Sequence, residues 1–233
     1  MAYLSPKTII TDFLRNNITD PRGRITSTSD TFVATASQTS FTLTPTTGKK
    51  FSHVVSVTVE GVAKTKWKDY YIDQKNQKVI FFTGITLAET VVVTFGEGAA
   101  NWIFPDKPNE KLEPESFPRM NILIVGMPGN RLGNYEAPVE ATPRVQIDIW
   151  CKEKQNGQIF TIDGSNYTGE DLAEYLSWQV TAAFENSESE LFPALYGYDP
   201  VGMPNDMPFV EEIQCHHKVV EFLLRGMDIG RIT

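Results

Sequence analysis

The first residues of the chain alternate between apolar and polar positions with the period of an α-helix. Ser5 is a favourable N-cap residue, and Pro6 suits the first helical position because its missing N–H leaves no helical hydrogen bond unmade. The apolar residues then recur at three- and four-residue spacing, at Ile9, Ile10, Phe13 and Leu14. The Asp-Pro-Arg-Gly sequence at 20–23 is typical of a turn. The pattern predicts one short helix with a single apolar stripe.

Residues 26–98 show instead the period of two that is typical of β-strands. Val55, Val57 and Val59 alternate with polar side chains, which predicts a half-buried strand. Further strands are predicted at residues 31–35, 40–44, 67–73, 78–82 and 91–95. Short strands at this close spacing, joined by polar or glycine-containing links, indicate a small β-sandwich or barrel.

Prolines interrupt the pattern between residues 99 and 119. Pro105, Pro108, Pro114 and Pro118 exclude a long helix, because proline has no N–H to donate and its ring clashes with the preceding turn. Two interpretations of this segment remain open. It is either an extended arm that lies across a neighbouring molecule or a linker between two domains.

The remaining residues combine strands with a second helix. The pattern predicts strands at 121–125, 144–151 and 212–225, glycine- and proline-rich loops at 126–133 and 186–208, and a hairpin arm around 158–162. A helix begins near residue 169, with Thr168 as its cap and Asp171 three residues further on, close to a capping box. Its buried stripe is predicted to consist of Leu172, Leu176, Val180, Ala183 and Phe184.

Together these elements predict an α+β fold with an inserted module. A mixed or antiparallel sheet is expected from the three strands of the second half, with both helices packed on one face, because each helix has only one apolar stripe to bury. The inserted module is an all-β sandwich. The predicted domains are therefore residues 1–25 with 99–233, and residues 26–98.

Composition narrows the classes of function. The 233 residues carry 21 Lys and Arg against 29 Asp and Glu, a net charge of −8, which disfavours a general nucleic-acid binder. No apolar run approaches the roughly 20 residues that cross a bilayer, and the first residues lack the layout of a secretory signal. The two cysteines, Cys151 and Cys215, are too few for a disulfide framework. We expect a cytosolic protein.

The acidic charge is concentrated in the second half. No Lys or Arg occurs between Lys154 and Lys218, whereas eleven Asp and Glu do. Two interpretations are open: a solvated acidic surface, in which Glu170 and Asp171 also suit the start of a helix, or an acidic wall that repels the phosphates of a passing DNA duplex.

Signals of enzymatic chemistry are weak. The sequence contains no phosphate-binding loop, dinucleotide fingerprint, nucleophile elbow or zinc-protease motif. Cys151, Cys215 and His217 would suit zinc if neighbouring strands brought them together, but two buried thiols and strand histidines explain them as well. Residues 163–166 resemble the start of a calcium loop, but the later glycine and the bidentate glutamate of such a loop are missing, so a turn explains them better. Trp67, Tyr70 and Tyr71 suit either a sugar site or a core. We predict no catalytic site, no cofactor and no metal.

Two segments in the second half resemble a known family. The sequences Thr-Pro-Arg-Val-Gln-Ile-Asp-Ile-Trp-Cys-Lys-Glu at 142–153 and Tyr-Thr-Gly-Glu-Asp-Leu-Ala-Glu-Tyr-Leu at 167–176 are similar to the tail-terminator or tail-completion proteins of long-tailed phages. In that family a strand of this kind precedes a helix, and a closing strand, here 214–224, returns to the sheet. The resemblance covers roughly residues 119–185, 208–230 and the opening helix. The module at 26–98 looks like a β-sandwich found on phage structural proteins and departs from the minimal terminator.

The resemblance implies a virion protein of the tail or neck, assembled in the host cytoplasm. The family forms a ring, usually a hexamer, that ends the tail tube, joins it to the head connector and lets DNA pass without specific binding. The implied partners are other copies of the chain, the tail-tube protein and the head-completion or stopper protein. The expected contact residues are Pro105, Pro108, Pro114, Met127, Arg131, Leu132, Ile159 and Phe160. Glu170 and Glu174 are candidates for an acidic face at the lumen.

Three other functions remain open. The nearest is another neck protein, such as a head-completion adaptor or stopper, or a baseplate component. The second is a carbohydrate- or receptor-binding module that uses Trp67 and Tyr70 of the sandwich. The third is a metal enzyme that uses Cys215 and His217.

Overall fold

The computed structural model describes residues 6–105, 117–126, 129–131, 139–141, 143–153, 159–162, 164–187, 190–191, 197–211, 214–225 and 227–228. The described residues are mostly β-structure with two α-helices. The strands pair antiparallel, except for the short parallel pair β8–β9. The α+β class with antiparallel sheets therefore holds in outline.

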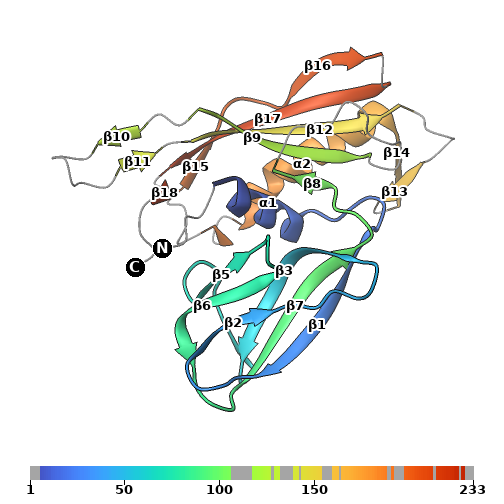
Figure 1. The fold of residues 1–233 in the computed structure, drawn as a ribbon. Helices are drawn as coiled ribbons and strands as arrows, with labels where there is room; N and C mark the ends of the chain where they lie inside the picture. The colour runs from blue at the N-terminus through green and yellow to red at the C-terminus, as the bar shows by residue number, and fades with distance from the viewer. Residues whose placement is uncertain are drawn as a thin grey trace. The chain divides into compact units, whose positions relative to one another are not determined.

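The chain separates into two compact units (Figure 1). The main unit comprises Met1–Arg22 and Trp102–Thr233, and the inserted unit comprises Gly23–Asn101. The boundaries differ by three residues at each end from the limits of 26 and 98 that the change of pattern indicated.

The inserted unit contains two antiparallel sheets. The first has the order β1 (Ile25–Val33), β7 (Thr90–Gly98), β3 (Lys50–Val59) and β4 (Val62–Ala63). The second has the order β2 (Gln38–Thr42), β6 (Lys78–Ile85) and β5 (Tyr70–Asp73). Strand β1 begins six residues before the segment predicted at 31–35, because all nine of its residues pair with β7. The sequence did not indicate this early start, because the first part of the strand consists mainly of serine and threonine and has no apolar alternation.

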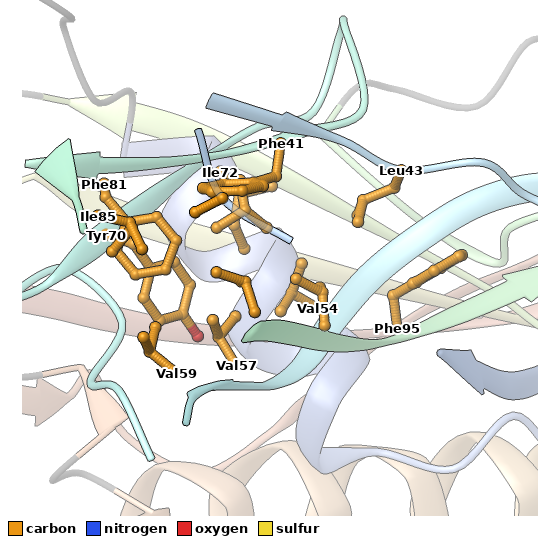
Figure 2. Close-up of a cluster of buried hydrophobic side chains, with 14 of the residues drawn as sticks. Phe41, Leu43, Val54, Val57, Val59, Tyr70, Ile72, Phe81, Ile85 and Phe95 are labelled. Atoms are coloured by element: carbon orange, nitrogen blue, oxygen red, sulfur yellow. The ribbon is translucent and has the colours of Figure 1, made fainter. Parts of the chain in front are cut away.

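One hydrophobic core joins these two sheets (Figure 2). The first sheet contributes Val54, Val57, Val59, Val91, Val93 and Phe95, and the second contributes Phe41, Tyr70, Ile72, Val79 and Phe81. Alternate residues of a strand point to the same face, so the period of two in the sequence becomes a continuous apolar layer. Trp67 and Tyr70 are buried, which confirms their interpretation as core residues and removes them as an exposed sugar platform. Tyr71 is half-buried and stacks on Phe82, with ring centroids 5.6 Å apart.

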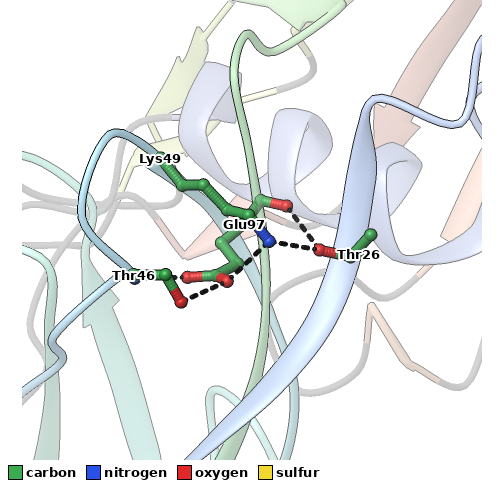
Figure 3. A network of polar contacts seen from close by, with 4 residues as sticks. All are labelled: Thr26, Thr46, Lys49 and Glu97. Carbon is green, nitrogen blue, oxygen red and sulfur yellow. Dashed lines mark hydrogen bonds and ion pairs between the residues drawn. The ribbon is translucent and has the colours of Figure 1, made fainter.

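A buried carboxylate fixes the loop that precedes β3 (Figure 3). Glu97 of β7 accepts hydrogen bonds from the backbone N–H of Thr46 at 2.6 Å and from its hydroxyl at 2.7 Å. The Lys49 ammonium donates to the same carboxylate at 3.0 Å. The backbone hydrogen bond from Thr46 is the largest influence on the pKa of Glu97 and, with its other donors, lowers it despite burial. The loop is thereby tied to the central strand of the sheet.

The sheet of the main unit has six strands, with the order β15-β17-β12-β9-β8 and β16 also paired to β17. Its strands are β8 (Ile103–Phe104), β9 (Arg119–Gly126), β12 (Arg144–Lys152), β15 (Gly197–Pro200), β16 (Asn205–Val210) and β17 (Cys215–Arg225). The predicted strands at 121–125, 144–151 and 212–225 correspond to β9, β12 and β17. Strands β15 and β16 lie in a segment that the sequence pattern indicated as loop.

Two smaller groups of strands complete the main unit. One is the three-stranded sheet of β10 (Gly129–Arg131), β11 (Val139–Ala141) and β18 (Met227–Asp228). The other is the antiparallel pair of β13 (Phe160–Ile162) and β14 (Ser165–Tyr167), which confirms the hairpin predicted around 158–162. Gly164 in its turn has φ +77°, a left-handed conformation that favours glycine.

Both predicted helices are present. Helix α1 (Pro6–Asn17) buries Ile9, Ile10, Phe13 and Leu14, and α2 (Gly169–Ser187) buries Leu172, Leu176, Val180, Ala183 and Phe184, as the spacing predicted. The Phe184 ring lies 5.1 Å from the Phe13 ring and 4.1 Å from the Phe222 ring of β17, measured between centroids. Phe184 is fully buried, and such burial contributes about 2–3 kcal/mol. It connects α1, α2 and the sheet.

Candidate interaction surface

The most exposed strand of the main sheet is β16, which lies at its edge (Figure 1). It pairs with β17 over residues 205–210, with a register shift between Met207 and Val210 that surrounds Pro208. Met207 and Phe209 keep 44% and 42% of their surface exposed. An edge strand leaves backbone groups free to pair with another chain, and proline with a bulge limits how many of them can do so. The strand thus offers apolar side chains and a short backbone edge to a partner.

A buried lysine holds this edge in position. The side chain of Lys218 in β17 is only 7% exposed. Its ammonium lies 2.7 Å from Oδ1 of Asp206 in β16 and also donates to Glu174 of α2. Trp178 donates from its indole nitrogen to the other oxygen of Glu174 at 2.7 Å. One cation therefore connects the edge strand, the adjacent strand and the helix.

The charges of this cluster support one another. Burial by itself lowers the pKa of Lys218, but hydrogen bonds to Asp206 and Glu174 outweigh it, so the pKa lies above its ordinary value. The hydrogen bond from Lys218 is the main reason that the pKa of Glu174 is lowered. Lys218 and Glu174 therefore favour their ionised forms at neutral pH, and Asp206 places a second carboxylate beside the ammonium.

The face of the sheet that carries His217 has its own polar cluster. The His217 ring stacks on Trp150, with centroids 3.8 Å apart and planes at 10°. Its Nε2 lies 3.3 Å from Oδ1 of Asp148, which accepts a hydrogen bond from Gln146 at 2.7 Å. Cys215 lies two residues before His217 in the same strand, but burial raises the pKa of its thiol to about 12. A protonated thiol is a poor nucleophile at neutral pH, so this arrangement disfavours cysteine catalysis.

The register of β12 and β17 separates the three residues of the zinc hypothesis. Cys151 is opposite His216, whereas Cys215 is opposite Lys152 and His217 is opposite Trp150. Opposed residues of an antiparallel pair point to the same face and consecutive residues alternate, so Cys151 lies on the other face from Cys215 and His217. The hypothesis that all three converge is therefore wrong. Across the described ranges, no three His, Cys, Asp or Glu side chains gather as metal ligands do.

The predicted contact residues are distributed over several parts of the main unit. Pro105 follows β8 and is half-buried, and Ile159 is exposed just before the hairpin. Phe160 is half-buried, with the Arg22 guanidinium 5.8 Å from its ring centroid. Arg131 lies in β10, although its side chain is outside the described residues. The other predicted contacts also lie outside them: Pro108, Pro114, Met127 and Leu132.

The two predicted lumen residues differ in their surroundings. Glu170 lies in the first turn of α2 and is exposed, which agrees with its predicted position at a helix start. Glu174 is bound by Lys218, so its charge is partly neutralised. Sequence analysis missed Lys218, Asp206 and β16. One signal for Lys218 was present, because it is the only Lys or Arg between Lys154 and Arg225.

Comparisons of the chain with protein-family models, with curated proteins and with solved structures found no match. Neither described helix has the length and apolar composition needed to cross a bilayer.

Proposed function

We propose that this chain is a non-catalytic structural protein of the head–tail junction of a tailed virus. It forms a ring with copies of itself, a hexamer by the resemblance, ends the tail tube and joins it to the head connector. Its partners are the tail-tube protein and the head-completion or stopper protein. The genome passes through the ring without specific binding, and the protein is part of the tail or neck of the virion after assembly in the host cytoplasm.

The observation that carries the proposal concerns the two segments that resemble tail terminators, because they form neighbouring elements of the main unit. Residues 144–152 of the first segment form β12, and the second segment begins α2. Both elements contact β17, whose outer neighbour is the exposed strand β16. An exposed strand edge with apolar side chains beside this strand–helix–strand unit is a surface of the kind through which identical subunits can associate.

We also propose that α1 and α2 cover the same face of the main sheet. Two ring contacts support this arrangement, because Phe184 of α2 lies against both Phe13 of α1 and Phe222 of β17. Lys218, which faces α2 through Glu174, belongs to the same side of β17 as Phe222, four residues further on.

The exposed acidic residue Glu170 suits a surface beside passing DNA. Like charge repels phosphate and prevents the duplex from binding. Glu174 contributes less to such a surface because Lys218 binds it. Charge reversal at Glu170 tests this position. If tails, infectivity and DNA delivery are unchanged, Glu170 does not face the lumen.

Removal of the gene from the encoding virus tests the function. The expected result in negative-stain images is filled heads beside over-long or unjoined tails, because tube growth is no longer stopped. Heads that leak their DNA beside normal tails would instead assign the chain to the stopper or adaptor class. Normal, joined particles would contradict the proposal.

A further inference from the structure

The inserted unit has an exposed strand edge of its own. Strand β4 is the outermost strand of its sheet and pairs only with β3 among the described strands. Val62 of this strand keeps 61% of its surface exposed, and Ala63 is also exposed. Lys64, which is half-buried, and Lys68, which is exposed, follow it in the chain. The edge therefore combines aliphatic side chains with positive charge.

Charge is divided unevenly between the two units. Residues 23–101 contain eight Lys and Arg against six Asp and Glu, a net charge of +2. The other residues contain thirteen against twenty-three, a net charge of −10, and the two values together give the −8 of the chain. The β16 edge belongs to the acidic part, since residues 197–217 contain four Asp and Glu and no Lys or Arg. Within the chain Asp206 pairs with Lys218 and Asp199 with Arg225. Glu211, exposed at the end of β16, is therefore the carboxylate that offers negative charge to the lysines that follow β4.

The far edge of the main sheet is a poorer candidate. Its last strand is β8, and the carbonyl of Ile103 already accepts two hydrogen bonds from the Arg15 guanidinium, at 3.0 and 2.5 Å. A side chain that occupies the backbone acceptor protects an edge from pairing with another strand. An interface made by joining β16 to β8 of the next copy is therefore disfavoured.

We propose that the β16 edge of one copy binds the β4 edge of the inserted unit of a second copy. Met207 and Phe209 pack against Val62, and Glu211 lies near Lys64 and Lys68 of the other molecule. The two surfaces are different, so the contact is head-to-tail, and a pair of copies keeps one free edge of each kind for further copies. The proposal rests on the self-association in the proposed function and names the surfaces that make it.

The β16 edge requires a partner with an apolar surface for Met207 and Phe209 and a positive charge for Glu211. The β4 edge of this same chain has both, so we infer that the partner is a second copy. An apolar strand edge without basic residues would leave Glu211 unpaired, and a duplex of nucleic acid would be repelled by the acidic segment. The lysines that follow β4 also suit DNA, and that alternative is an outcome of the test.

Crosslinking between two purified variants of the full chain tests the contact. V62C and M207C proteins are mixed over a range of concentrations up to the millimolar range and treated with a short bis-maleimide. The native Cys151 and Cys215 are fully buried and do not react. We expect a V62C–M207C adduct at least tenfold more abundant than the adduct of M207C with S27C. Ser27 is an exposed residue of β1, at the opposite edge of the same sheet.

Charge reversal separates this contact from chance collisions. The K64E/K68E substitutions in the V62C copy should reduce the adduct several-fold, and E211K in the M207C copy should restore it. K50E/K75E, which reverses two other exposed lysines of the inserted unit, is the matched control. An adduct no more abundant than that with S27C would overturn the proposal. So would an adduct unchanged by K64E/K68E while retention on duplex DNA is lost.

The result is independent of where the chain occurs in a virion. A specific adduct from a protein that is missing from particles would leave this contact standing and end the head–tail function. Particles that contain the chain at the neck, without the adduct, would end this contact and leave the function standing.

Discussion

The residues next to Lys218 in the sequence give no indication of the side chains that surround it in the fold. Its neighbours in β17 are histidine and valine, yet its ammonium is enclosed by carboxylates 12 and 44 residues away, in β16 and α2. A buried cation is expensive unless it is paired, and here two acceptors compensate for the lost water. Lys218 is therefore a structural anchor for the edge strand.

Replacement of this lysine should destabilise the main unit. Lys218→Met keeps the length of the side chain but leaves Asp206 and Glu174 without their cation. Because both carboxylates remain partly in water, we expect a loss of about 1–2 kcal/mol in the free energy of unfolding. Urea denaturation measures it. Lys75→Met, at an exposed turn, should change stability by less than about 0.5 kcal/mol, and equal effects of the two variants would contradict the anchor.

We predict that the stability of the inserted unit depends on pH through Glu97. Its pKa in the folded protein lies below the ordinary value of 4.5, so ionised Glu97 stabilises the fold. That contribution is complete above the unfolded pKa and is lost as the pH falls through the folded pKa. Glu97→Gln should be less stable at neutral pH, and its stability should fall less steeply in acid. The same measurement on Glu89→Gln, a half-buried carboxylate of the same unit, serves as the control, and parallel acid curves for wild type and Glu97→Gln would refute the assignment.

At the scale of elements, strand β16 and strand β12 represent opposite extremes. Strand β12 is paired on both sides, with β9 and β17, whereas β16 pairs on one side and interrupts its register at Pro208. Amide hydrogen exchange should therefore be slow in β12 and much faster in β16, because edge backbone groups open locally. Equal protection of the two strands would mean that the outer edge of β16 is already covered in the isolated protein.

The elements that the sequence predicted correctly are those with one buried face. Both helices, β12 and β17 have regular apolar periods, and the structure contains each of them. Strand β3 is also present, but the alternation predicted at Val55, Val57 and Val59 is wrong at Val55, which is exposed because a register shift between Val54 and Ser56 interrupts the strand. Strand β15 was missed because its four residues, Gly-Tyr-Asp-Pro, are too few to show an apolar alternation. Strand β16 was missed because both of its faces are largely exposed, so burial imposes no alternation on its residues. A strand whose residues contact solvent on both sides has no hydrophobic period to detect.

The sequence alone could not predict which side chains of neighbouring strands lie on the same face, because this depends on the register in which the strands pair. The alternation in β17 correctly indicated that Cys215 and His217 share a face. The register with β12 decides whether Cys151 joins them, and a shift of one residue reverses that answer. The ion pairs of Lys218 have the same origin, since they depend on contacts between segments that are distant in the chain.

At the scale of the whole molecule, the inserted unit has the features of an independent domain. Its core draws on strands of both of its sheets and on residues 34–95 alone. We expect residues 23–101, expressed alone, to unfold in one cooperative transition. A domain of this size buries only about 60% of its surface, so its stability should be modest. Dispersed amide resonances in a heteronuclear NMR spectrum would support this expectation, and collapsed resonances would contradict it.

The uneven division of charge gives the molecule two chemically different surfaces to share with neighbours. The acidic main unit suits a ring that DNA passes without binding, and the more basic inserted unit suits a contact with the acidic unit of another copy. Both suggestions describe function through surfaces and shape, consistent with the shielded thiols and dispersed titratable groups of the described residues.

The most direct measurement is the location of this chain in purified virions, by electron microscopy with gold-labelled antibody against it. The account predicts label concentrated where the head meets the tail, in a ring-shaped density that contains several copies. Particles that bind no label, or label confined to the distal end of the tail, would contradict it.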